Sequence, residues 1–150
     1  MADNYIDITQ DASGAIKALG NAKSKIEELL LQGMEKALLM IESDAKKNCP
    51  VDEGRLRASI THDKEAKDDE IIGRVGTNVE YAPYVEMGTG IYAQNGDGRK
   101  TPWIWEGDSV KWKGEHLTRG QKPKRFLQNA VDSNREKIGE VFKETMEGLK

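Results

Sequence analysis

Residues 24–48 read SKIEELLLQGMEKALLMIESDAKKN, and this segment has the strongest helical periodicity of the chain. Its apolar side chains recur at three- and four-residue spacing, which places them on one stripe of a helix. Ser24 followed by Glu27 predicts a capping box at the start of the helix, and Pro50 predicts its stop. We therefore expect a long amphipathic helix. Its buried stripe should contain Ile26, Leu30, Met34, Ala37, Leu38, Ile41 and Ala45.

The composition fits a small globular protein. The chain has 150 residues, a net charge of -3 and 33% charged residues. A core of this size buries roughly two thirds of the surface that the unfolded chain exposes. The acidic balance argues against a protein that coats nucleic acid through a globally basic surface. We expect a single domain over residues 1–150.

Cysteine usage and apolar patterning bear on the compartment. Cys49 is the only cysteine, so the chain forms neither an internal disulfide nor a cysteine-built zinc site. Residues 1–20 carry early acidic side chains and lack the basic segment and apolar run of a secretion signal. No stretch approaches the roughly 18 apolar residues of a membrane span. We expect a soluble protein that is made inside the cell and has no membrane contact.

The N-terminal segment, residues 1–20, is expected to form an arm outside the long helix. Tyr5, Ile6 and Ile8 predict a short strand within it. A weak helix is expected near residues 15–19.

The segment after the long helix has the two-residue period of a strand. Residues 50–54, PVDEG, are turn-forming. In residues 56–61 apolar and polar side chains alternate, which predicts a half-buried strand. The acidic run DKEAKDDE at residues 63–70 predicts a solvated hairpin tip, and residues 71–77 predict the return strand.

A second hairpin and a second long helix are expected in the C-terminal half. Residues 103–105 and 110–112 flank a turn-forming tetrad, which predicts two paired strands. The helical period returns over residues 124–149. The order of elements lacks the regular alternation of a parallel sheet. We predict an α+β fold in which a long N-terminal helix and a C-terminal helix pack on an antiparallel sheet.

Three strings of the sequence carry a family pattern: CPVDEGRLRASI (residues 49–60), VGTNVEYAPYVEMGTG (75–90) and RGQKPKRFLQNAV (119–131). Together they resemble the tail-completion or head-tail joining family of long-tailed bacteriophages and prophages. In that family a long helix leads into a proline and a D-x-G-x-L-x-x-S-I segment. A G-T-x-x-x-Y-A-x-Y-x-E-x-G-T segment follows, and then a proline and an aromatic residue open a C-terminal helix. Residues 91–120 are longer and richer in tryptophan than this pattern, and we expect an extended loop or hairpin there.

The resemblance implies a structural virion protein and no enzyme. It implies a small α+β subunit that assembles as a hexameric ring, at the end of the tail tube or at the neck where tail and capsid meet. It implies no active site, no cofactor and no metal. The expected partners are further copies of the chain, the tail tube, the head-tail connector proteins and, transiently, passing DNA. The implied location is the virion tail or neck, after synthesis in the cytoplasm of the bacterial host.

Two groups of aromatic residues are candidate contacts with partner subunits. Tyr81, Tyr84 and Glu86 precede the glycine-rich residues 88–90, which lack the Lys-Ser/Thr ending of a phosphate-binding loop. Internal packing of the tyrosines beside a tight glycine turn is equally favoured. A hairpin with exposed tryptophans would be a strong docking element, whereas the same rings can also cover the core. The second group comprises Trp103, Trp105 and Trp112.

One cationic cluster without an acidic residue occupies residues 119–125. Its candidate contact residues are Arg119, Lys122, Lys124 and Arg125. Clustered positive charge suits DNA phosphates and also suits an acidic patch on a neighbouring subunit. We favour the protein partner because the cluster abuts the expected start of the C-terminal helix. The alternative function is a small nucleic-acid-binding regulator that uses this segment, although the net acidity counts against it.

Neither catalysis nor metal binding has a complete set of residues in the sequence. His62 and His116 are the only histidines, and neither has a nearby nucleophile with an orienting acid. A hydrolase that uses His116 and an acid is the third hypothesis. The acidic run at residues 63–70 lacks the spacing and the glycine of a calcium loop. We expect His62 to be a surface histidine beside this run.

Overall fold

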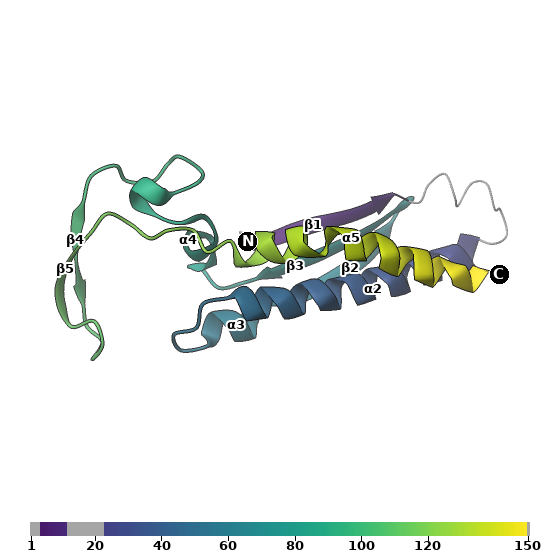
Figure 1. The fold of residues 1–150 in the computed structure, drawn as a ribbon, viewed down its shortest axis with the longest axis horizontal. Helices are drawn as coiled ribbons and strands as arrows, with labels where there is room; N and C mark the ends of the chain where they lie inside the picture. The colour runs from purple at the N-terminus through teal and green to yellow at the C-terminus, as the bar shows by residue number, and fades with distance from the viewer. Residues whose placement is uncertain (1–3, 12–22, 150) are drawn as a thin grey trace. The chain divides into compact units, whose positions relative to one another are not determined.

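The computed structural model describes residues 4–11 and 23–149. The chain divides into two compact units, of which the second is Glu80–Arg125 and the first is the remainder. The first unit contains a three-stranded sheet and helices α2, α3 and α5, and the second contains α4 and a hairpin (Figure 1). The single domain expected from the sequence stays a prediction. The weak helix expected near residues 15–19 lies outside the described residues.

Helix α2 (Lys23–Asn48) carries the core of the first unit. All seven residues of the predicted stripe are buried, together with Leu29 and Gly33, so the predicted helix is confirmed. The helix ends where predicted, and its last turn is closed by the Cys49 amide, which donates to the Ala45 carbonyl oxygen at 2.9 Å. The predicted capping box is wrong, because α2 begins one residue before Ser24.

Three antiparallel strands form the sheet of the first unit. Strands β1 (Asn4–Asp11) and β2 (Thr61–Lys67) flank β3 (Glu70–Thr77), in the order β1-β3-β2. The central strand packs on α2 through its buried face. Gly73 allows the closest approach, since a Cβ there would lie 2.5 Å from Met34 Sδ and 2.9 Å from Leu38 Cδ2. The short N-terminal strand predicted from the sequence is thus β1, and the return strand is β3.

The strand predicted over residues 56–61 is wrong. Residues Arg55–Ser59 form the short helix α3, in which the Ala58 amide donates to the Gly54 carbonyl oxygen at 2.9 Å. Leu56 and Ile60 are buried and Ala58 is exposed. Because two buried residues four apart fit a helical turn as well as an alternating strand, the pattern over so few residues does not distinguish the two structures.

The hairpin tip predicted over residues 63–70 is also wrong in extent. Strand β2 continues to Lys67, and only Asp68 and Asp69 turn. Asp63 and Glu65 are exposed on this strand, and both pair with a cation across the sheet. Arg74 of β3, for example, donates to Glu65 at 2.7 Å. The charged composition of this segment correctly indicated that it is exposed. It did not indicate the strand, in which ion pairs between β2 and β3 contribute to the pairing.

Helix α5 (Phe126–Met146) continues into the short η3 (Glu147–Leu149) and packs along α2 (Figure 1). Its buried apolar residues are Phe126, Leu127, Ala130 and Phe142. The predicted contributors Val131, Ile138 and Val141 are only half-buried, and Leu149 is exposed. The predicted helix is confirmed, with its start at Phe126. Among the described residues, no helix has the length and apolar character needed to cross a membrane.

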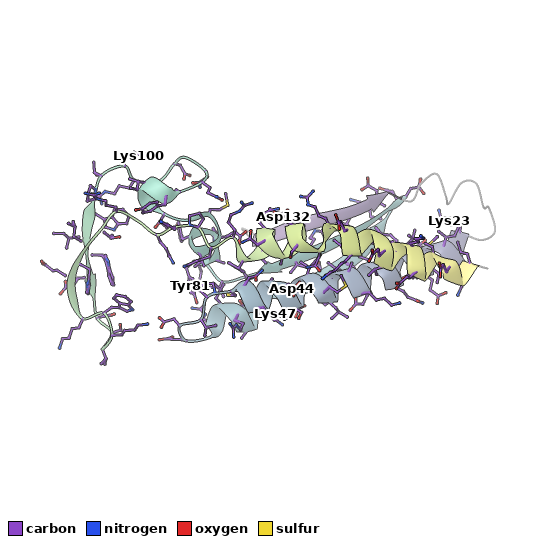
Figure 2. All side chains as sticks on the ribbon, in the orientation of Figure 1. Lys23, Asp44, Lys47, Tyr81, Lys100 and Asp132 are labelled. Atoms are coloured by element: carbon purple, nitrogen blue, oxygen red, sulfur yellow. The ribbon has the colours of Figure 1, made fainter. Side chains whose placement is uncertain are left out.

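One polar contact joins the two long helices. Asn134 of α5 is 1% exposed and donates from Nδ2 to Asp44 Oδ2 of α2 at 2.8 Å. Lys47 pairs with the other carboxylate oxygen at 3.0 Å, and Figure 2 shows Asp44 and Lys47 near each other on α2. These bonds, from Asn134 first and then Lys47, lower the pKa of Asp44 below its ordinary value of 3.8. The contact fixes the register of α5 on α2.

The second unit contains α4 (Ala82–Met87), the short turn η2 (Gly90–Tyr92) and an antiparallel hairpin. The hairpin consists of β4 (Trp103–Gly107) and β5 (Gly114–Thr118). The predicted second strand at residues 110–112 is wrong, since the Trp112 amide donates to the Ser109 carbonyl oxygen at 3.1 Å and closes a turn there. With its two long helices and antiparallel sheets, the protein has the predicted α+β fold.

Two glycines within helices give a matched test of the α2–α5 packing. A Cβ at Gly33 would lie 2.8 Å from Cδ1 of the buried Phe142 ring, whereas a Cβ at Gly139 would meet nothing within 4 Å. We expect Gly139→Ala to raise the free energy of unfolding by about 0.5–1 kcal/mol through helix propensity. We expect Gly33→Ala to lower it, because overpacking costs about 1–3 kcal/mol. Denaturant unfolding measures both, and equal stabilisation by the two variants would contradict this packing.

Candidate functional site

The cationic segment of residues 119–125 lies beside residues 85–91 in the second unit. Two backbone bonds join its first half, from the Thr89 amide to the Gln121 carbonyl oxygen at 2.9 Å and from the Ile91 amide to that of Arg119 at 3.1 Å. Two more join its second half, in which the amides of Lys124 and Arg125 donate to carbonyl oxygens of α4 at 2.8 and 3.1 Å. The segment is therefore held in a defined conformation.

Gly88 and Gly90 make this close approach of the two segments possible. Both have positive φ, 80° and 61°, which side chains other than glycine rarely adopt. A Cβ at Gly88 would lie 2.8 Å from the Gln121 carbonyl oxygen, and one at Gly90 would collide with that of Arg119. The Gly-Thr-Gly sequence thus serves backbone docking in addition to turning the chain.

The cationic side chains of this segment differ in their exposure. Arg119, Lys122 and Lys124 are exposed, and Arg125 is half-buried. Lys122 Nζ lies 5.9 Å from the centroid of the Tyr92 ring, a cation–π contact. Within the described part of the chain, Arg119, Lys122 and Lys124 have no ion pair. The segment therefore presents unneutralised positive charge on a fixed backbone.

The tyrosines before the glycines are exposed at the start of α4. Tyr84 is 61% exposed, and Tyr81 is exposed at the residue that precedes the helix. Glu86 is half-buried on the same helix. The alternative expectation was that these rings pack inside the protein, and Tyr84 does not, because most of its side chain is exposed. Contact of this group with a partner subunit stays a prediction.

The structure brings two of the three tryptophans together on one face of the hairpin. Trp105 stacks on His116, which is directly opposite in β5, with ring centroids 4.8 Å apart. Trp112, from the connection between the strands, lies 6.4 Å from Trp105 and meets the His116 ring edge-on at 6.0 Å. Trp103 lies under the Arg99 guanidinium group, 5.5 Å from the ring centroid. This tryptophan–histidine cluster supports one face of the hairpin.

The surroundings of His116 are those of a packing residue. Besides its aromatic contacts, Nε2 donates to the Trp112 carbonyl oxygen at 3.0 Å. The hydrolase hypothesis requires an acid to orient this ring, and the ring bond observed goes to a backbone carbonyl instead. Across residues 4–11 and 23–149, no group of three or more His, Cys, Asp and Glu residues is placed to hold a metal ion.

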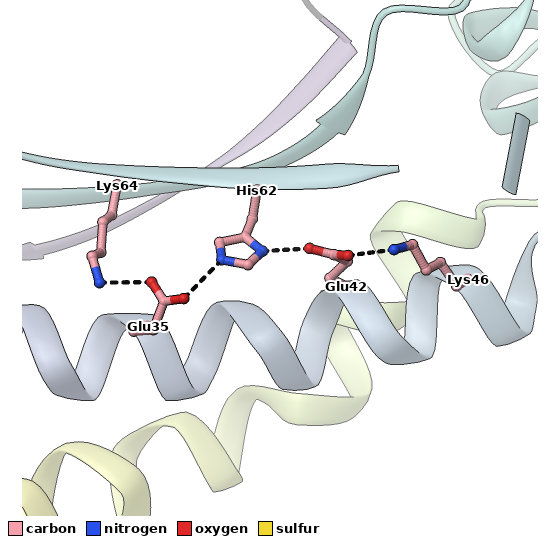
Figure 3. Close-up of polar contacts among 5 residues, drawn as sticks. All are labelled: Glu35, Glu42, Lys46, His62 and Lys64. Atoms are coloured by element: carbon pink, nitrogen blue, oxygen red, sulfur yellow. Dashed lines mark hydrogen bonds and ion pairs between the residues drawn. The ribbon is translucent and has the colours of Figure 1, made fainter. Parts of the chain in front are cut away.

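Sequence reasoning missed a network that joins β2 to α2 (Figure 3). His62 is 16% exposed at its side chain and lies between two carboxylates of α2, so its expected surface position is wrong. Its Nδ1 bonds to Glu42, and its Nε2 lies 3.2 Å from Glu35 Oε1. Lys46 pairs with Glu42, and Lys64 Nζ lies 2.6 Å from Glu35 Oε2. The available signal was the seven-residue spacing of the two glutamates, which is two helical turns.

The cations of this network stabilise the charged form of both glutamates. The bond from Lys64, and then the bond from His62, lowers the pKa of Glu35 below its ordinary value of 4.5. Burial raises the pKa of Glu42, but the bonds from Lys46 and His62 prevail and lower it below 4.5. The network is an electrostatic clamp between the sheet and α2.

The lowered pKa values predict a loss of stability in acid. A carboxyl group with a depressed folded-state pKa stabilises the fold fully above its unfolded pKa, and this stabilisation is lost as the pH falls through the folded pKa. We expect the free energy of unfolding to fall below pH 4.5. The double variant Glu35→Gln, Glu42→Gln should be less stable at neutral pH and less sensitive to acid. Denaturant titrations over this pH range test it, with the exposed Glu53→Gln as control. An unchanged acid dependence in the double variant would refute the clamp.

The backbone docking of residues 119–125 predicts a matched pair of glycine variants. Gly90→Ala introduces both positive-φ strain and a collision with the Arg119 carbonyl oxygen, whereas Gly96→Ala at φ 78° has open space around the new Cβ. We expect limited trypsin to cleave after Arg119, Lys124 or Arg125 about tenfold faster in Gly90→Ala, since a local opening that is easier by about 1.4 kcal/mol suffices. The Gly96→Ala protein should resemble the unmodified chain. Equal protection of both variants would show that the docking is not needed.

Comparison with known proteins identifies the family. The family model described as "Bacteriophage HK97-gp10, putative tail-component" matches residues 14–88, which is half of the chain. This range includes α2, α3, β2, β3 and α4, together with the whole of the first string that carries the resemblance and residues 75–88 of the second. No curated protein and no solved structure was found to match. The chain therefore belongs to the HK97-gp10-like family of bacteriophage tail components, and it is a structural protein of the phage tail.

Proposed function

We propose that this tail component completes the tail or joins it to the head, by assembling as a closed ring of copies. The observation that carries the proposal is the family match to a tail component, combined with a second unit whose aromatic and cationic side chains are exposed. Tail tube and head-tail connector proteins are the proposed partners, and the neck or tail end is the proposed station. Transient contact with passing DNA stays a prediction.

The composition of the exposed surface supports assembly. Tyrosine, tryptophan and arginine are enriched in the cores of protein–protein interfaces. The second unit presents Tyr84, Trp105, Trp112 and Arg119 as exposed residues. Burial of such rings in a partner's surface supplies association energy, while the charged residues around them select the partner.

The kind of surface involved is compatible with the proposed ring. The exposed residues of the second unit form chemically different patches, one on the hairpin and one cationic on residues 119–125. When two different patches of one subunit bind each other between copies, the contact is head to tail, and it either closes into a ring or continues as a filament. A ring at the end of a tail tube is the closed solution, and six copies is the number that the family resemblance implies.

Removal of the hairpin segment tests the proposal. Gly90 and Arg119 are neighbours in space, so residues 91–118 can be replaced by a short glycine linker. We expect the first unit to fold unchanged, as measured by circular dichroism. Complementation of a phage that lacks this gene should yield at least about tenfold fewer tailed particles, because loss of hot-spot contacts costs about 2 kcal/mol or more.

The control is Leu39→Ser, which removes an exposed apolar side chain from the first unit. It should support normal numbers of tailed particles in the same complementation assay. A hairpin-deleted protein that joins heads to tails as well as the complete chain does would overturn the assembly role of residues 91–118.

A further inference from the structure

The two faces of the β4–β5 hairpin differ sharply. Residues directly opposite in an antiparallel pair share a face, so Trp105 and His116 lie on the face that carries the tryptophan–histidine cluster. The opposite face carries four residues as two cross-strand pairs. These are Ile104 with Leu117 and Glu106 with Glu115, and we call them the outer face.

The outer face is unfavourable in free energy when the chain is not bound to a partner. Ile104 and Leu117 are 63% and 74% exposed, so this apolar pair remains in water. Glu106 and Glu115 place two negative charges directly opposite each other, an arrangement that destabilises a strand pair. Neither carboxylate has an ion pair within residues 4–11 and 23–149. A two-stranded hairpin is marginally stable by itself, which makes these costs significant.

A ligand that relieves both costs must combine apolar surface with closely spaced cations. The chain itself presents such a surface on residues 119–125 and the adjoining η2. Arg119, Lys122 and Lys124 supply the cations, without ion pairs among the described residues. Ile91 and Tyr92, which are exposed beside them, supply the apolar contact. Because four backbone bonds fix this segment, little ordering is needed on binding.

We propose that the outer face of the hairpin docks on residues 119–125 of a second copy of this chain. Glu106 and Glu115 pair with the cations of the second copy, and Ile104 and Leu117 pack on its η2 residues. The inference rests on the proposed ring function and names the contact that would build the ring. Because the two patches differ, a docked pair of copies leaves one free patch of each kind, and the contact repeats from copy to copy until a ring closes.

Charge reversal gives a test with a built-in rescue. The acidic-face variant reverses the charge of the outer face by Glu106→Lys with Glu115→Lys. The basic-patch variant reverses the charge of residues 119–125 by Arg119→Glu with Lys122→Glu and Lys124→Glu. Each altered protein alone carries patches of like charge and should fail to associate, as measured by light scattering over a range of concentrations. A mixture of the two should associate again, because every contact then joins opposite charges in alternating copies. High salt should weaken the association of the unmodified chain.

The matched control reverses two exposed acidic residues elsewhere, Glu53→Lys and Asp97→Lys. It has the same net charge as the acidic-face variant and should associate normally. Circular dichroism shows whether each variant is folded. If both patch variants associate as the unmodified chain does, or if the mixture of folded variants fails to recover, the docking contact is wrong and the ring proposal remains.

Cross-linking within assembled particles tests the docking contact if the purified chain stays monomeric in solution. Carbodiimide joins carboxylates and amines that are in contact, so particles assembled from isotope-labelled and unlabelled chains should yield links between copies. We expect links from Glu106 or Glu115 to Lys122 or Lys124. Particles that contain adjacent copies but lack these links overturn the docking contact. Tails that form and join normally without the protein overturn the proposed function itself.

Discussion

The first unit depends on the burial of one helical stripe. The apolar face of α2 is covered by the sheet and by α5, and its fully buried members Ile26, Met34 and Leu38 are inaccessible to water. Two glycines set how closely the neighbours approach, Gly73 from the sheet and Gly33 toward Phe142 of α5. Polar contacts then select one arrangement among those that bury the same stripe. The Asn134–Asp44 bond fixes α5, and the network around His62 fixes β2. Apolar burial thus drives the packing, while hydrogen bonds and charges define its register.

The second unit is organised by backbone contacts, because it buries few large apolar side chains. Its two ends, residues 85–91 and 119–125, are joined by main-chain hydrogen bonds that only glycine at positions 88 and 90 permits. Between them the hairpin is supported by aromatic stacking on one face. Most side chains of this unit are therefore exposed and do not contribute to a buried core. The same side chains are then available for contacts with other proteins, as is common for loops and hairpins on a fixed scaffold.

The sequence predicted the elements whose pattern is long and repeated. Helix α2 and its buried stripe were evident because seven apolar residues agree on one period, and α5 was evident for the same reason. Errors arose where the pattern is short. Leu56 and Ile60 fit two periods, and Trp112 suggested a strand where the chain turns. The His62 network joins residues up to 29 positions apart, so only the packing of β2 on α2 brings them together. The candidate contact residues of the hairpin stay a prediction, and the division of the hairpin into two different faces required the register of β4 and β5.

The extent of the family match bears on where this protein's own specificity lies. The match ends at residue 88, just as the chain enters the glycine-bounded hairpin segment. The matched segment supplies α2, α3, β2, β3 and α4, which are scaffold elements. Specificity is set by attractive and repulsive contacts at the rim of an interface. An uncompensated pair of glutamates on an otherwise apolar face is a selective feature of this kind, since it disfavours every partner that cannot supply cations at that place. In the proposed docking contact, the cost that Glu106 and Glu115 impose on the isolated chain is therefore the physical basis for choosing among partners.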